Sequence, residues 1–144
     1  MPRELPEALR QKVILRAHHC CEYCLYPEGL SSFAHQLDHI VSRKHGGTSD
    51  LSNLAYCCLF CNRYKGSDVA AIDSSTGEPI RLFHPRLYRW PDHFRLYGAL
   101  IEPVTREGEV TERLLRFNQP ERILERTILQ SIGLYPCAGR PSDA

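Results

Sequence analysis

Two matched pairs of cysteines constrain this chain more than any other feature of its sequence. The first pair is Cys21 and Cys24, and the second pair is Cys58 and Cys61. Two residues between the members of a pair let both sulfurs turn toward one tetrahedral zinc ion, and two such pairs complete a structural site. The pattern therefore predicts one zinc ion held by four thiolates. Such an ion has no open position for a substrate, so any chemistry must come from other residues.

Neighbouring cysteines leave the register of this site open by one position. Cys20 precedes the first pair and Cys57 precedes the second, so ligation through Cys20 or Cys57 is an alternative. We favour Cys21, Cys24, Cys58 and Cys61 as ligands because both pairs then share one spacing. On that interpretation Cys20 and Cys57 are spare thiols or small buried hydrophobic residues.

The composition is that of an ordinary globular protein of one-domain size, with 144 residues. The 18 basic and 17 acidic side chains exclude an overall basic chain, although a local basic surface remains possible. We find no apolar run long enough to span a membrane and no signal-peptide pattern at the start. We therefore expect a cytoplasmic protein without membrane contact, in which grouped cysteines indicate metal binding before disulfides.

The segment between the cysteine pairs contains side chains suited to chemistry. Asp38 and His39 are adjacent, and Asn62 directly follows the second pair. Carboxylate and amide oxygens suit magnesium or manganese better than a second zinc ion. A neutral imidazole can take a proton from water at physiological pH. Together these groups are what metal-assisted hydrolysis of a phosphodiester requires.

At these residues the sequence resembles the HNH endonucleases, in the branch that has two Cys-x-x-Cys zinc pairs. The resemblance covers about residues 10–66, and its motifs occur in this order: Cys21-x-x-Cys24, Asp38-His39-Ile40, Gly46-Gly47, Asn53-Leu54, Cys58-x-x-Cys61-Asn62 and Lys65-Gly66. It implies an α+β protein with a ββα-metal core. Two antiparallel strands would carry Asp38-His39 and the residues after Asn53, and a helix would carry Asn62.

The resemblance also implies a role for each of these residues. His39 would be the general base that activates the attacking water, while Asp38 and Asn62 would hold one magnesium or manganese ion. Asn53 would fix the loop backbone so that His39 faces the phosphate. Many members have histidine at the position of Asn62, where an amide oxygen favours magnesium or manganese over softer metals.

DNA is the partner that the resemblance implies, and nearby cations are candidates for holding it: Arg43, Lys44, Arg63 and Lys65. Phosphate binding draws on such side chains, although each of them also suits a solvated charged loop. The segment 81–97 combines arginines with aromatic residues. This composition suits either a surface that stacks on bases or a cap that packs on the core. We favour the cap, because a small zinc module needs additional burial.

Residue patterns further divide the chain into a nuclease core (1–70), a small α+β extension packed on it (71–137) and a frayed tail (138–144). In the core we expect helices over 7–17 and 61–65 and an extended segment over 31–41. In the extension we expect a strand over 96–104, a turn at 107–109, a short helix capped by Thr111 and a longer helix capped by Asn118. The longer helix would bury Ile123, Leu124, Ile128 and Ile132 on one face.

The leading interpretation is a metal-dependent HNH endonuclease that hydrolyses DNA phosphodiester bonds. The alternative is a non-catalytic, zinc-ribbon-like module that binds nucleic acid or protein, which has no use for the set Asp38, His39 and Asn62. A redox or zinc-storage role for the cysteines is a weaker possibility, because their paired spacing across a fold argues against it. Monomer and homodimer both remain open.

Overall fold

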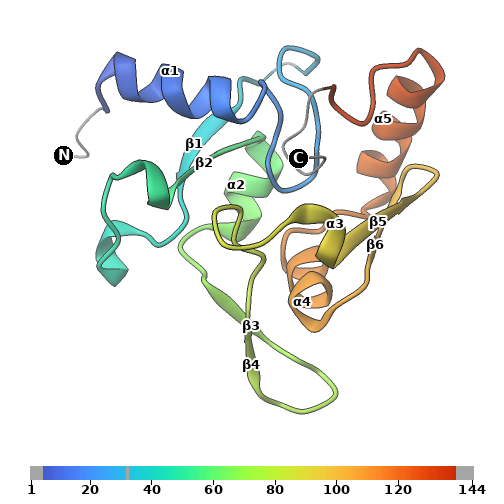
Figure 1. The fold of residues 1–144 in the computed structure, drawn as a ribbon. Helices are drawn as coiled ribbons and strands as arrows, with labels where there is room; N and C mark the ends of the chain where they lie inside the picture. The colour runs from blue at the N-terminus through green and yellow to red at the C-terminus, as the bar shows by residue number, and fades with distance from the viewer. Residues whose placement is uncertain (1–4, 32, 139–144) are drawn as a thin grey trace.

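In the described residues, three small antiparallel sheets, five α-helices and two short 3₁₀ helices make up the α+β fold (Figure 1). The structure is a computed structural model that describes residues 5–31 and 33–138. The predicted tail lies outside the described residues except for Ala138. Each sheet has only two strands, so side chains from helices and loops supply much of the core. None of the described helices is long and apolar enough to cross a bilayer.

The N-terminal half forms a ββα unit preceded by a helix. Its elements are α1 (Glu7–Arg16), β1 (Gln36–His39), the 3₁₀ helices η1 (Arg43–His45) and η2 (Leu51–Asn53), β2 (Leu54–Cys57) and α2 (Leu59–Lys65). In the antiparallel pair β1–β2, Asp38 lies opposite Ala55 and His39 lies opposite Leu54. Helix α2 begins directly after β2, because the Cys58 sulfur accepts the Cys61 N–H and so caps the helix. The predicted ββα order is therefore present.

The C-terminal half consists of two hairpins and three helices. Its elements are β3 (Ala70–Ile72), β4 (Pro79–Arg81), α3 (Trp90–His93), β5 (Phe94–Tyr97), β6 (Leu100–Pro103), α4 (Arg106–Leu114) and α5 (Pro120–Ser131). Hairpin β3–β4 projects from the body of the molecule (Figure 1). The single strand predicted over 96–104 is wrong: Gly98, at φ +58°, turns the chain there, so that β5 and β6 pair with each other.

Two predictions of helix starts in this half are also wrong. Residues 107–109 form the first turn of α4, whose cap is Thr105, with its hydroxyl accepting the Gly108 N–H. A side chain at Gly108 would collide with the His93 carbonyl, so glycine permits close packing here rather than a turn. Asn118 does not cap α5, because its side chain bonds to the backbone N–H and C=O of Ile101.

Helix α5 buries the face opposite to the one its apolar residues predict. Leu124, Ile128 and Ile132 are each more than half exposed. The inward side chains are Arg122, Arg126 and Leu129. The prediction failed because both guanidinium groups find backbone or sulfur acceptors inside the protein, which periodicity alone does not reveal.

Residues from both halves share one hydrophobic core. Phe83, Trp90 and Phe94 of the Arg/aromatic segment are buried in it beside Cys21 and Leu25 of the N-terminal half. The Phe83 and Phe94 rings meet edge-on at 5.4 Å. Burial of these aromatic rings agrees with the interpretation of this segment as a cap.

Specific polar contacts also hold the cap to the ββα unit. Trp90 Nε1 donates to the Tyr23 carbonyl at 2.9 Å. Arg86 forms an ion pair with Glu22, whose other carboxylate oxygen accepts the Tyr56 N–H on β2. Buried charges of this kind require both partners, so the two halves are expected to be stable only together. The boundary at residue 70 stays a prediction.

Cys20 is not a spare thiol, because it forms a disulfide with Cys137. The bond joins the last described segment to the start of the first cysteine pair. This disulfide was not predicted, because grouped cysteines in a reducing compartment indicate metal binding. Cys57 is free and buried, as predicted for a spare cysteine.

Arg126, with 1% of its surface exposed, is expected to be a major contributor to stability. Its guanidinium donates to the carbonyls of Ala99 and Phe117 and to the Asn118 side chain. Arg126→Met leaves these buried acceptors without a donor and should lower the free energy of unfolding by about 3 kcal/mol. The matched change Ile128→Ala on the exposed face should cost about 0.5 kcal/mol or less. Urea unfolding checks both, and equal effects would contradict the assignment.

Candidate functional site

Four cysteine sulfurs come together in the core at the junction of the two cysteine pairs. The sulfurs of Cys21, Cys24, Cys58 and Cys61 all lie within 4.8 Å of one another and all four residues are buried. The Cys24 and Cys58 sulfurs are 3.7 Å apart. Zinc–sulfur bonds of about 2.3 Å in a tetrahedron require nearly this separation, so the donor set fits zinc. The structure therefore brings together the four predicted ligands, in the predicted register.

Backbone amides support one sulfur in each pair. The Cys24 N–H points at the Cys21 sulfur at 3.4 Å, and the Cys61 N–H points at the Cys58 sulfur at 3.5 Å. Donors to sulfur stabilise the thiolate form, which is the form that binds metal. The chain turns after the first pair at Leu25, whose φ of +66° bends the backbone around the sulfurs.

A buried arginine from the extension completes the surroundings of the cysteines. Arg122 of α5 donates to the Cys61 sulfur at 3.2 Å and to the Cys58 sulfur at 3.7 Å. Burial alone lowers the pKa of Arg122, but the cysteine sulfurs nearby outweigh it and raise the pKa above its usual value. Four thiolates around a divalent ion keep a net negative charge, which this cation partly neutralises. Sequence spacing gave no signal for this contact.

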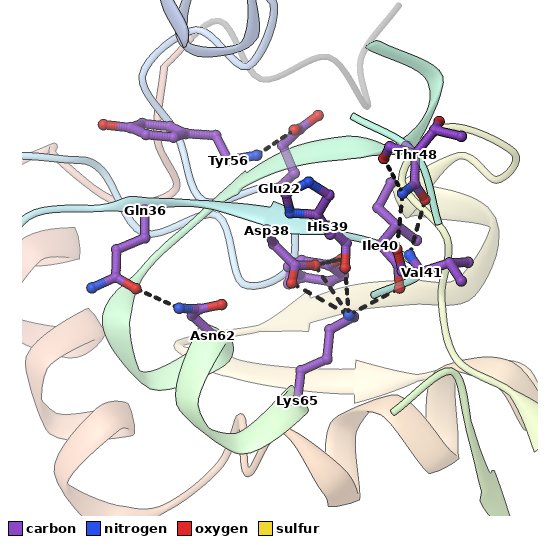
Figure 2. A network of polar contacts seen from close by, with 12 residues as sticks. Glu22, Gln36, Asp38, His39, Ile40, Val41, Thr48, Tyr56, Asn62 and Lys65 are labelled. Atoms are coloured by element: carbon purple, nitrogen blue, oxygen red, sulfur yellow. Dashed lines mark hydrogen bonds and ion pairs between the residues drawn. The ribbon is translucent and has the colours of Figure 1, made fainter. Parts of the chain in front are cut away.

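Asp38 lies on the face of β1 that points toward α2 (Figure 2). It is 4% exposed, accepts the Tyr23 hydroxyl at 2.8 Å and pairs with the Lys65 ammonium at 3.1 Å. Burial raises the pKa of Asp38, and the Lys65 charge and the Tyr23 hydrogen bond partly offset that rise. A carboxylate has about four lone-pair sites, so these two contacts leave capacity for a metal ion.

Lys65 is not on the surface, which corrects its expected role as a DNA contact. It is 2% exposed, and its ammonium reaches the carbonyls of His39 and Ile40 besides the Asp38 carboxylate (Figure 2). A side chain enclosed in this way cannot contact a phosphate. Its contacts instead fix the end of β1, where Asp38 and His39 lie.

His39 projects from β1 on the opposite side from Asp38, as successive residues of a strand do. Its Nε2 lies 3.0 Å from the Ser49 hydroxyl, which also accepts a hydrogen bond from Arg43. Burial, followed by the Arg43 charge, lowers the pKa of His39 below its usual value. A lowered pKa favours the neutral imidazole, which is the state that a proton acceptor needs.

Asn53 fastens the loop that follows His39. Its amide oxygen accepts the Val41 N–H at 2.9 Å, and its nitrogen donates to the carbonyls of Val41 and Thr48 (Figure 2). Gly47 makes this closure possible, because a side chain there would lie 1.8 Å from the Val41 oxygen. These are the contacts that a loop-fixing role requires.

Asn62 lies in the middle of α2 and faces β1, the strand that carries Asp38. Its amide nitrogen donates to the Gln36 side chain, away from the Lys65–Asp38 pair (Figure 2). Within the described residues no hydrogen bond joins Asp38 to Asn62. The Asn62 oxygen and the Asp38 carboxylate remain hard ligands of the type that magnesium and manganese prefer.

The remaining cations expected at DNA lie around the site on the surface. Lys44 and Arg63 are exposed, and among the described residues neither side chain has a hydrogen bond or an ion pair. Arg43 is also exposed, and its guanidinium donates to the Ser49 hydroxyl beside His39. All three are accessible to a ligand, unlike Lys65.

The fold and the cysteine cluster define a ββα module with a buried set of four cysteines that could hold a metal ion. Residues 21–68 match the family model described as HNH endonuclease. The match spans both cysteine pairs, β1, β2 and α2, and ends before β3, so the similarity to HNH endonucleases covers this segment alone. No curated protein and no solved structure matches the chain.

Proposed function

We propose that this protein is a metal-dependent endonuclease that hydrolyses DNA phosphodiester bonds beside the end of β1. The observation that carries the proposal is the position of His39, within the HNH match and on a strand end that Lys65 and Asn53 both fasten. A module that only binds nucleic acid gains nothing from fixing an imidazole in this way. The alternative zinc-ribbon-like module is therefore less well supported.

His39 is assigned as the general base, which takes the proton from the attacking water. Asp38 and Asn62 are assigned as the ligands of one magnesium or manganese ion, since they supply hard oxygen donors from β1 and α2. When bound there, the ion neutralises charge on the phosphate and on the leaving oxygen. Tyr23 and Lys65 orient the Asp38 carboxylate, while Asn53 orients the loop after His39.

DNA is the proposed substrate, with Arg43, Lys44 and Arg63 as its phosphate contacts. These cations lie in the loop after β1 and on α2, so they flank His39 and Asn62. Each phosphate contact releases counterions, and binding should therefore weaken steeply as salt rises. A cytoplasmic location stays a prediction.

Nicking of supercoiled plasmid tests the proposed activity. Protein freed of loosely held metal is incubated at low salt with magnesium, with manganese or without added metal, and its zinc content is measured in parallel. We expect conversion to the open circle only when magnesium or manganese is added, at unchanged zinc content. Binding of the plasmid without nicking in every condition would favour the non-catalytic module.

Asn53→Ala is expected to lower the turnover rate about tenfold to a hundredfold, with a small effect on DNA affinity. The change removes all three hydrogen bonds to the loop, so the backbone that places His39 is released. Single-turnover nicking, measured well below the melting temperature, separates this effect from loss of fold. Wild-type turnover in a folded Asn53→Ala protein would exclude the positioning role.

A further inference from the structure

A groove lies between the loop that follows His39 and the hairpin β3–β4. It has a volume of about 560 Å³ and is lined by Val41, His45, Ser67, Asp68, Val69, Ala70 and Arg81. Val41 comes two residues after His39, so the groove starts beside the assigned base. The opposite wall, formed by β3 and β4, lies beyond the HNH match and belongs to the extension.

Arg81 is an exposed cation on this wall without a protein partner. In the part of the chain that the structure describes, its guanidinium has no hydrogen bond and no ion pair, and the His45 imidazole across the groove has none either. Arg106, another arginine near the hairpin, is engaged by Asp73. Asp68 is the only acidic residue lining the groove. A free guanidinium beside a nuclease site suits a phosphate oxygen.

The remaining lining of the groove is apolar or small. Val41, Val69 and Ala70 line the groove together with His45 and Arg81, and Val69 is 40% exposed. One strand of DNA offers the matching chemistry, because its charged phosphates alternate with the apolar surfaces of sugars and bases. A protein or peptide partner gains less here, since the apolar area is small and divided.

The hairpin is held in place rather than free. Arg106 of α4 bonds to Asp73 at 2.8 Å, and Arg113 of the same helix donates to the Ile72 carbonyl. The Leu82 N–H donates to the Val69 carbonyl, which joins the hairpin base to the groove floor. Arg81 therefore has a defined position relative to His39, as a phosphate contact requires.

We propose that this groove binds the stretch of one DNA strand next to the bond cut at His39, with Arg81 contacting one of its phosphates. The proposal rests on the proposed nuclease function and gives the extension a part in holding substrate. It predicts that substrate binding depends on hairpin β3–β4, which the HNH match does not include.

Binding of labelled DNA in the His39→Ala background tests this groove without interference from cleavage. Anisotropy is measured for a duplex and for a single strand across a range of salt concentrations. Arg81→Ala should weaken binding about threefold to tenfold and reduce the slope of log affinity against log salt by about one. Arg81→Lys should keep most of the slope, because it keeps the charge. Arg95→Ala, which removes an exposed arginine on β5, is the matched control and should change neither quantity.

Together, the possible outcomes distinguish a failure of the groove proposal from a failure of the proposed nuclease activity. Equal losses in Arg81→Ala and Arg95→Ala would show that only net charge matters, and would overturn the groove. Binding by the parent that Arg81→Ala leaves unchanged would overturn the groove and leave the nuclease proposal standing. Failure of the parent to bind either DNA would overturn both. Melting temperatures establish that each variant is folded.

Discussion

We expect His39→Ala to abolish plasmid nicking and to leave zinc content and melting temperature unchanged. A positioned general base contributes about a hundredfold to ten-thousandfold to a hydrolysis rate, so residual nicking should fall to the background of the assay. The fold should tolerate the change because the imidazole is only partly buried and its one side-chain partner is the Ser49 hydroxyl. The measurement is initial-rate nicking with magnesium or manganese, beside wild-type protein.

His39→Asn sharpens this test. Asparagine keeps a polar group near Ser49 but cannot accept the proton, so its loss should be as large as that of His39→Ala. Retention of more than a tenth of wild-type activity in either variant would remove His39 as the base. If a variant loses its nicking rate and its DNA binding together, the His39 side chain instead has a structural role.

The cysteine spacing was sufficient to predict the cysteine cluster, and the resemblance to HNH endonucleases implied the ββα unit. Cys58 and Cys61 are separated by the spacing that both caps α2 and directs their sulfurs together. The same loop closure needs both Gly47 and the side-chain amide of Asn53. The presence of both in the sequence was therefore informative about this loop. The spacing within each cysteine pair is local, whereas the contact of Cys24 with Cys58, across 34 positions, was predicted from the matched spacing of the two pairs.

The failures concern contacts between residues far apart in the chain. The disulfide of Cys20 with Cys137 and the buried position of Arg122 against the cysteine sulfurs leave no local pattern. Lys65 was expected at DNA because a lysine after a metal ligand is usually solvated, whereas Asp38 and two backbone carbonyls satisfy it inside. Tyr23, the other partner of Asp38, was overlooked because it lies within the first Cys-x-x-Cys pair.

Cys61→Ser is expected to release zinc and to unfold the ββα unit, whereas Cys57→Ser retains both zinc and fold. Cys61 and Cys57 are both completely buried, but only Cys61 belongs to the four-sulfur cluster. Structural zinc contributes about 10–16 kcal/mol in small zinc peptides, which is comparable to the entire stability of a domain at about 5–15 kcal/mol. Loss of one ligand should therefore remove the cooperative melting transition, as should prolonged exposure of the wild-type protein to a chelator.

The Arg122 contact predicts that this unfolding extends into the extension. When the thiolates lose their ion and one sulfur, a buried guanidinium is left with weakened partners, and α5 is destabilised together with the core. Metal analysis, far-ultraviolet circular dichroism and urea unfolding of the two serine variants check this. Zinc at one equivalent and native melting in Cys61→Ser would exclude the cluster as the element that holds the fold. If only the ββα unit unfolds while α5 stays protected from hydrogen exchange, Arg122 does not couple the two halves.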